Sequence, residues 1–396
     1  MTKKTRSFCP AQPTNLASRL ARHWRSGWPL GLTLTLPQIL RAEDQVDYRY
    51  EYYKEDNNRM TINTHSVYFE QKLVDSIIAK GELVYDGISG ATPTGTVYPS
   101  GKIALTHLED TRRSLSLQLD GKVSSDNTLT PGFAYSKESD YQSYGISLND
   151  AIQFNEKNTT LQYGVSQNFD SVRNTDHNTG KYIWSDKYST EGIVGISQLL
   201  SPKTILTADF TFGNDSGYLS DPYRLAGYQP TGFPFSIGVP ERRPSHRNKE
   251  VFYTSLTQYF DKVNASLEGS YRFYNDSFGV VANTVGLTWH QWLGKHFIVE
   301  PMFRFYEQSA ANFYATTFSG PFTINPNGPP GFHSSDYRLS EFYSTDMGTQ
   351  LTGVINDHVH IVVGYHRYEM HGLDGKTSSA MYPKANVYTV GISFLW

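Results

Sequence analysis

Charged side chains recur at every second position in several stretches of this 396-residue chain. On a β-strand, side chains two residues apart project from the same face. On the inner wall of a wide barrel, such charges would meet water and tune ion selectivity. Both signs occur along nearly every stretch, so the same residues can equally cross-link neighbouring strands and fill the bore. The candidate lumen residues are Arg49, Lys80, Glu82, Asp120, Lys122, Asp209, Glu268, Arg272, Glu300 and Arg304.

A second group of candidates lies in one long connection, residues 214–247, which is rich in Pro, Gly and Arg. Connections of this length are usually functional or disordered. Three interpretations stay open: the segment folds into a barrel mouth as a constriction, it binds lipopolysaccharide phosphates through Arg242, Arg243 and Arg247, or it is disordered. The candidate loop residues are Asp221, Tyr223, Arg224, Arg242 and Arg243.

Patterns for metal binding and catalysis are weak. His358 and His360 have a spacing that can ligate a metal, but no carboxylate recurs beside them. We therefore predict neither a metal site nor a cofactor. The chain has no Gly-x-Ser-x-Gly, no His-Glu-x-x-His, no phosphate loop and no dinucleotide fingerprint. We predict a non-enzyme, with a surface hydrolase built on outer-loop Ser and His residues as a further alternative.

One acid falls on a face that is otherwise apolar. Asp150 shares its period-two face with Tyr144, Ile146 and Leu148. A charge that faces lipid is costly, less so near the interface. We interpret Asp150 as turned inward by a bulge or placed beside a turn.

Strands with one apolar face are the elements that would position these residues. Leu115, Leu117 and Leu119 alternate with polar residues, and the same alternation continues to the last strand, where Val390, Ile392 and other apolar residues share one face. Such period-two alternation indicates strands with one buried or lipid-facing side.

The connections favour a barrel over a soluble sandwich. Short turns rich in Ser, Asn, Asp, Gly and Lys lie at 73–76, 124–127, 155–158, 201–203, 261–262, 294–295 and 355–357. They alternate with four long connections at 87–111, 173–186, 214–247 and 310–335, and with four shorter ones at 55–59, 137–140, 275–279 and 372–380. This layout predicts an all-β fold: an antiparallel transmembrane outer-membrane β-barrel of about 16 strands, with short periplasmic turns and longer extracellular loops.

Composition excludes two other classes. Only 38% of residues are hydrophobic and the mean hydropathy is -0.48, so membrane helices are excluded. Aromatic residues make up 14%, too many for a disordered chain.

The first 42 residues have the layout of a signal peptide. They hold seven basic residues and no acid, and an apolar run at 28–40 precedes a small residue, Ala42. A disordered basic tail is the alternative. We therefore predict a signal peptide at 1–42 and a barrel domain at 43–396.

Removal of this leader changes the charge. The remaining 28 basic and 38 acidic residues give a net charge of about -10 in place of -3, and Cys9 leaves with the leader. The acidic balance argues against a nucleic-acid partner and favours cations if the bore conducts.

Aromatic residues gather near expected strand ends, as in Tyr48, Tyr50 and Tyr52, and such girdles are typical of outer-membrane barrels. The final strand carries Gly391, Phe394 and Trp396 in a pattern that resembles the signal read by the outer-membrane assembly machinery. Outer-membrane lipid, lipopolysaccharide and that machinery are the predicted partners.

Several stretches resemble a bacterial family designated domain of unknown function 3570. They include Val84-Tyr-Asp-Gly-Ile-Ser-Gly-Ala-Thr-Pro-Thr-Gly95, Gly217-Tyr-Leu-Ser-Asp-Pro-Tyr-Arg224 and Ser335-Asp-Tyr-Arg-Leu-Ser340. The resemblance spans most of the chain beyond the leader. It implies an outer-membrane barrel and supplies no activity or functional residues.

Two functions follow as hypotheses. The first is an outer-membrane pore for small solutes or ions, with selectivity set by lumen charges and inward-folded loops. The second is a plugged barrel that anchors or docks an export or surface assembly.

Overall fold

The computed structural model describes residues 44–98, 100–176, 179–321 and 331–396. The signal peptide predicted at 1–42 lies outside these described residues, as does Cys9.

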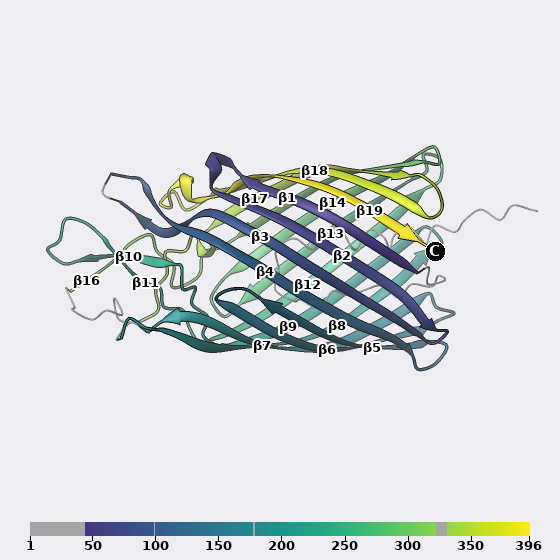
Figure 1. The fold of residues 1–396 in the computed structure, drawn as a ribbon, viewed down its shortest axis with the longest axis horizontal. Helices are drawn as coiled ribbons and strands as arrows, with labels where there is room; N and C mark the ends of the chain where they lie inside the picture. Colours follow the sequence, from purple (N-terminus) through teal and green to yellow (C-terminus); the bar gives the residue numbers. More distant parts are fainter. Residues whose placement is uncertain (1–43, 99, 177–178, 322–330) are drawn as a thin grey trace, which may run out of the picture.

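Sixteen strands close into one antiparallel barrel in the described chain, which confirms the predicted fold class (Figure 1). The ring is completed where the first strand pairs with the last, from Gln45↔Leu395 to Glu55↔Ala385. The barrel strands are β1 (Gln45–Glu55), β2 (Met60–Val74), β3 (Ile77–Val97), β4 (Ile103–Lys122), β5 (Asn127–Lys137), β6 (Tyr141–Phe154), β7 (Thr159–Thr175), β8 (Tyr182–Ser201), β9 (Thr204–Gly217), β12 (His246–Phe260), β13 (Ala265–Asp276), β14 (Val281–Leu293), β15 (Phe297–Gln308), β17 (Phe342–Val354), β18 (Val359–Gly372) and β19 (Lys384–Leu395).

The apolar face of each strand points away from the barrel axis. Leu83, Leu117 and Val194 are among many exposed large hydrophobic residues, whereas acids such as Asp86 and Glu300 are buried on the opposite face. This inside-out distribution is that of a barrel surrounded by lipid, with polar residues lining the interior.

All seven predicted short turns join barrel strands at one end of the barrel, which we call the turn end. The turn after β6 places Asn155, Glu156 and Lys157 at positive φ, and Asn264 does the same before β13. Asn tolerates this left-handed conformation better than most residues. The opposite end, which carries the longer connections, is called the loop end.

Two of the predicted long loops, 87–111 and 173–186, are mostly strand. The β3–β4 hairpin continues as far as Val97 and Ile103, and the β7–β8 hairpin as far as Thr175 and Tyr182. The β3–β4 extension is rich in Gly and Thr, and in both extensions the two strands pair with each other instead of forming irregular loops.

The other two long connections build a second, three-stranded sheet at the loop end (Figure 1). The 214–247 connection supplies β10 (Leu225–Pro230) and β11 (Ile237–Pro240), and the connection after β15 supplies β16 (Phe318–Gly320). β10 pairs antiparallel with β11 and parallel with β16, so two connections that are far apart in sequence become one unit.

Helical residues of the described chain fall in three 3₁₀ turns, η1 (Asp56–Asn58), η2 (Tyr337–Leu339) and η3 (Ser379–Met381). None of the helices found there is long and apolar enough to cross a membrane.

The strand register predicts opposite effects for adjacent positions. Leu287 is 45% exposed on the outward face of β14, whereas Thr288 faces inward opposite Glu268. We expect Leu287→Arg to destabilise the barrel by about 2–4 kcal/mol, and Thr288→Arg to cost little because Glu268 offsets the new charge. Urea unfolding in lipid vesicles measures both. Equal destabilisation by the two variants would contradict the register.

Candidate functional site: an ion cluster across the loop end

A carboxylate without solvent contact lies at the centre of the loop-end structure. Asp336 is 0% exposed, and Ser334, Ser335 and Ser340 beside it are also buried. Asp336 precedes η2, and its side chain accepts a hydrogen bond from the backbone N–H of Arg338, which caps this single turn. A buried charge requires partners.

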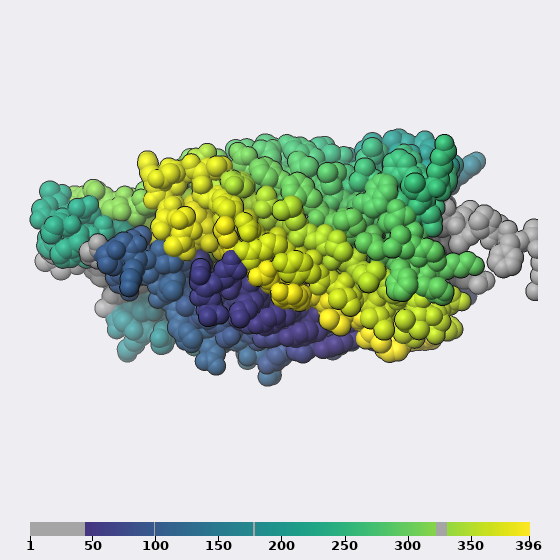
Figure 2. Space-filling model, turned by 90° about the horizontal axis from the view of Figure 1, so that it is seen from above, coloured from purple at the N-terminus to yellow at the C-terminus, as the bar shows by residue number. Residues whose placement is uncertain are grey.

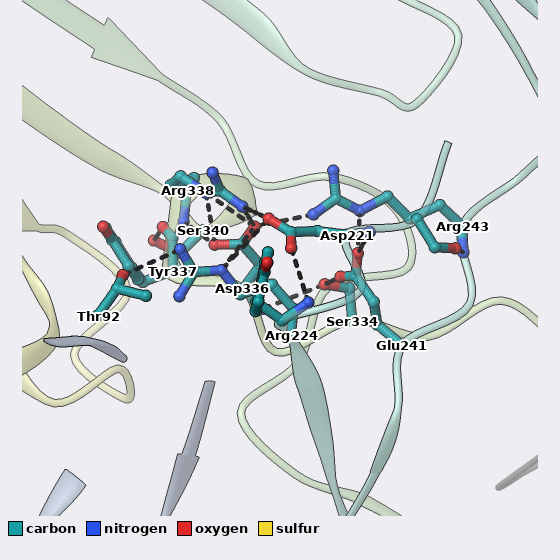
Figure 3. Close-up of polar contacts among 12 residues, drawn as sticks. Thr92, Asp221, Arg224, Glu241, Arg243, Ser334, Asp336, Tyr337, Arg338 and Ser340 are labelled. Carbon is teal, nitrogen blue, oxygen red and sulfur yellow. Dashed lines mark hydrogen bonds and ion pairs between the residues drawn. The ribbon is translucent and has the colours of Figure 1, made fainter. Parts of the chain in front are cut away.

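Three arginines supply the opposite charge (Figure 3). The guanidinium of Arg338 lies 2.5 Å from Oδ2 of Asp336, that of Arg243 lies 2.8 Å away, and Nε of Arg224 lies 3.8 Å away. Two of these arginines come from the 214–247 connection and one from the segment before β17. Asp336 therefore holds the two connections together.

Two further acids complete the cluster. Asp221 pairs with Arg338 at 2.5 Å and with Arg224 at 3.6 Å. Glu241 pairs with Arg243 at 2.8 Å and accepts a hydrogen bond of 2.6 Å from Oγ of Ser334. Three carboxylates thus meet three guanidiniums.

Hydrogen bonds fasten this cluster to the barrel wall at several points. Arg224 donates from Nη2 to the Oγ1 of Thr92 on β3, at 3.1 Å. On β15, the amide of Gln308 donates to the carbonyl oxygens of Arg338 and Ser340, at 3.0 and 2.8 Å. The hydroxyl of Ser340 lies 2.8 Å from that of Tyr382 just before β19.

Apolar packing supports the same segment from two sides. Leu339 packs with Tyr274, Phe278 and Ala282 of the β13–β14 hairpin. Tyr337 packs with Phe342, Met370 and Tyr382 on the other side. These contacts come from neighbouring strands between β13 and β19, and the bond of Arg224 to Thr92 ties the cluster to β3 in another part of the ring.

The electrostatic environment keeps Asp336 ionised. Burial acts to raise the pKa of Asp336, but the charges of Arg338, Arg224 and Arg243 outweigh it and hold the pKa below its ordinary value. By contrast, burial raises the pKa of Glu241. Since a carboxyl with a lowered pKa stabilises the fold above its unfolded pKa, the contribution of Asp336 is complete at neutral pH and lost only in strong acid.

The profile of the family described as a protein of unknown function, DUF3570, matches residues 32–103 and 99–396. The chain belongs to the DUF3570 family. Comparison with curated proteins gave no match.

Solved structures similar to this DUF3570 barrel include the siderophore receptor PirA from Pseudomonas aeruginosa, a bacterial polysaccharide outer membrane secretin, and OccK8 (OprE) from Pseudomonas aeruginosa. Sequence identities are 11%, 9% and 10%, and TM-scores are 0.42, 0.47 and 0.44. The matches cover 89%, 90% and 89% of this chain, and 61%, 99% and 98% of the respective structures. The chain thus spans about three fifths of the receptor's length. The likeness concerns the barrel fold and does not extend to activity.

The predicted loop residues of the DUF3570 chain take different places. Asp221, Arg224 and Arg243 belong to the ion cluster. Tyr223 donates its hydroxyl proton to Asp140 in the β5–β6 connection. Arg242 is exposed, with its guanidinium 5.9 Å from the ring centre of Phe332.

The three interpretations of the 214–247 connection can now be compared with its structure. The connection forms the strands β10 and β11, so the interpretation of a disordered segment is wrong. Arg243 has internal acidic partners, and so does Arg247, whose guanidinium lies 2.5 Å from Asp276. The cluster joins this connection to the segment before β17, and the constriction stays a prediction.

The candidate lumen residues lie on the inward face of β1, β3, β4, β9, β13 and β15. Lys80 pairs with Asp120 at 2.6 Å, and Glu300 accepts hydrogen bonds from Gln350 at 2.7 Å and binds His290 at 2.8 Å. These contacts cross from strand to strand, as the cross-linking interpretation expects. Lys122 lies exposed at the turn end, whereas Asp209 is buried. The other candidate lumen residues on this inward face are Arg49, Glu82, Glu268, Arg272 and Arg304.

One group of acids in the described chain is close enough to share a cation. Oxygen atoms of Asp110, Glu138 and Asp140 lie within 4.8 Å of one another near the loop end. Burial raises the pKa of Glu138 to about 7, and the charges of Asp140 and Asp110 add to this while Arg112 opposes it. His358 and His360 join no such group among the described residues.

The interpretation of Asp150 as turned inward by a bulge is wrong. Pairing of β6 with β5 and β7 runs through Asp150 without a register shift, so its side chain stays on the outward face. There it accepts a hydrogen bond of 2.5 Å from the hydroxyl of Tyr163 and borders an apolar hollow of about 680 Å³. The tyrosine provides a donor for one of its oxygens, which reduces the cost of the outward carboxyl.

Sequence reasoning missed Asp336, Arg338 and Glu241 as site residues. The only signal was the occurrence of Asp336 and Arg338 in a stretch that resembles the family. A single acid and a single arginine in a polar connection carry no signature of burial.

Removal of the central charge is predicted to loosen the loop end. Asp336→Asn leaves three arginines without their shared partner, and breaking a buried ion pair costs about 3–5 kcal/mol. We expect faster hydrogen exchange and proteolysis in residues 220–243 and 333–340, with the barrel still folded by its electrophoretic mobility shift. Asp75→Asn, at an exposed turn, is the matched control. Unchanged exchange in the Asp336 variant would contradict the central role of this carboxylate.

The acid group predicts a pH dependence. The pKa of Glu138 is raised in the folded chain, so folding takes up a proton between pH values of about 4.5 and 7. The free energy of unfolding therefore decreases as the pH rises through that window. Glu138→Gln should therefore be more stable than the wild type at pH 8 and similar to it at pH 4. Thermal unfolding at both pH values tests this, with Glu156→Gln in an exposed turn as control. A wild type whose stability relative to the variant does not change with pH would contradict it.

Proposed function

We propose that the protein is an outer-membrane pore for small solutes or ions whose mouth is narrowed by the Asp336 ion cluster. The main supporting observation is that one fully buried carboxylate, Asp336, joins two connections at the loop end. Its partners Arg224 and Arg338 are hydrogen-bonded to the barrel wall, at Thr92 of β3 and at Gln308 of β15. In this proposal, the turn end faces the periplasm and the loop end faces the exterior, as is usual for such barrels.

The interior chemistry supports passage of hydrated solutes. Sixteen strands enclose a bore wide enough for water, and charged residues line it on at least six strands. Because the lining residues carry both positive and negative charges, we expect only weak ion selectivity. The net negative charge of the chain after the predicted leader favours cations over anions.

A second candidate function is a closed barrel that anchors or docks another envelope component. The observation that favours it is the complete burial of Ser334, Asp336 and Ser340, since a segment packed this tightly can act as a permanent plug. Crosslinking in native envelopes would then capture a specific partner, and recovery of a lone barrel would count against this function.

Planar bilayer recordings separate the two functions. We expect stepwise, cation-selective conductance from the refolded chain, and a larger unit conductance from Asp336→Asn and Arg243→Gln because the mouth widens when the cluster opens. Asp75→Asn serves as the folded control with unchanged conductance. A folded barrel that stays silent in both the wild type and the cluster variants would overturn the pore.

A further inference from the structure

We propose that the outward surface at the loop end of β4 and β5 binds the phosphate group of an outer-leaflet lipid, with Arg113 and Lys137 as its cations. This inference rests on the outer-membrane orientation proposed above. It concerns the outer wall of the barrel, away from the ion cluster.

The two cations are direct neighbours. Arg113 of β4 is paired in register with Lys137 of β5, and both are exposed. Directly opposite residues of an antiparallel pair have their Cβ atoms about 4.5–5.5 Å apart, and like charges at such positions are destabilising. In the part of the chain that the structure describes, no ion pair or side-chain hydrogen bond engages either charged group. An anion between the two cations removes this repulsion.

The surface changes from apolar to basic at this row. Leu115, Leu117 and Leu119 follow Arg113 on the same outward face of β4. Beside them, the rings of Tyr135 and Tyr144 lie 5.0 Å apart between centres. Since tyrosines of barrel girdles lie at the membrane interface, the cations one row further toward the loop end lie at the level of lipid head groups.

The neighbouring residues suit an amphiphile better than a free anion. Leu83 is exposed and paired in register with Leu115, so the apolar surface on the turn-end side of the cations extends onto β3. Gln142, opposite Lys137, donates from its amide to the hydroxyl of Tyr144 at 2.5 Å. A lipid would therefore place its phosphate between Arg113 and Lys137 and its acyl chains against the leucines.

A second pair of cations near the loop end, on β18 and β19, differs from Arg113 and Lys137 because its charges have acidic partners. There Arg367 of β18 is bound by both oxygens of Asp56, at 2.8 and 2.6 Å, and by Glu369 at 3.1 Å. Lys384 of β19 also lies 3.4 Å from Glu369. Figure 2 shows this region where the yellow β18 and β19 meet the purple β1. The chain thus neutralises those cations itself, whereas Arg113 and Lys137 have no such acidic partner among the described residues and are available to an external anion.

The test compares two double variants of the full chain in neutral detergent. Arg113→Gln with Lys137→Gln removes the proposed site, and Lys157→Gln with Lys203→Gln removes the same charge from turns at the opposite end. Native mass spectrometry and titration measure binding of diphosphoryl lipid A, of its dephosphorylated form and of inorganic phosphate. We expect a loss of about tenfold or more in affinity for diphosphoryl lipid A in the first variant only, since each juxtamembrane cation contributes substantially to binding of anionic lipid.

Several outcomes would overturn the proposal. These are equal affinity of the wild type and the first variant, equal affinity for the dephosphorylated lipid, or full displacement of lipid by inorganic phosphate at equal concentration. The last result would identify a free-anion site. Because conductance is measured separately, a conducting barrel that fails to bind lipid A overturns this proposal alone, and a silent barrel that binds it overturns only the pore.

Discussion

Every other feature of this molecule depends on closure of the β-sheet. Within a bilayer, each backbone N–H and C=O must find a partner inside the protein. The pairing of β1 with β19, over the full length from Gln45 to Glu55, removes the last free edges. Because the wall is held by backbone hydrogen bonds, its side chains need not form a central apolar core. Hydrophobic residues can cover the outside, and the interior is left for charged residues.

The loop end solves a different problem with different chemistry. Its two connections meet through the β10–β16 pairing and a small apolar cluster of Ala226, Tyr228, Val239 and Phe318. Ions join them as well: three carboxylates and three guanidiniums lie around Asp336. Buried ion pairs add little net stability compared with apolar packing, but they penalise any arrangement that leaves one charge without its partner. We infer that this cluster fixes the position of residues 334–340 at the loop end. The small apolar clusters around Leu339 and Tyr337 hold these residues against the barrel wall.

The barrel could be predicted from sequence because its signals are local. Alternation of Leu115, Leu117 and Leu119 specifies a face within one strand, and turn residues such as Asn155 specify a hairpin within four residues. The extended β3–β4 hairpin was missed because Gly90 and Pro93 are typical of loops, although cross-strand pairing accommodates both.

The site was predictable only in part, for reasons of distance along the chain. Arg224 and Arg243 were found because they lie in a long, arginine-rich connection. Their partner Asp336 lies 93 residues beyond Arg243 and has no local signature. Likewise, the parallel pairing of β10 with β16 joins residues about ninety positions apart, and nothing in either short segment specifies the other. Asp150 was misinterpreted for the same reason: alternation places it outward, but the partner that makes this position tolerable, Tyr163, lies on the next strand.

The parallel pair of β10 with β16 also bears on the order of assembly. Contacts between segments this far apart carry a loop-closure cost. Strands β12 to β15 lie between the two halves of the small sheet, and their pairing shortens the chain that has to be closed. Loop-closure entropy therefore favours formation of the β12–β15 hairpins before the small sheet joins its two halves.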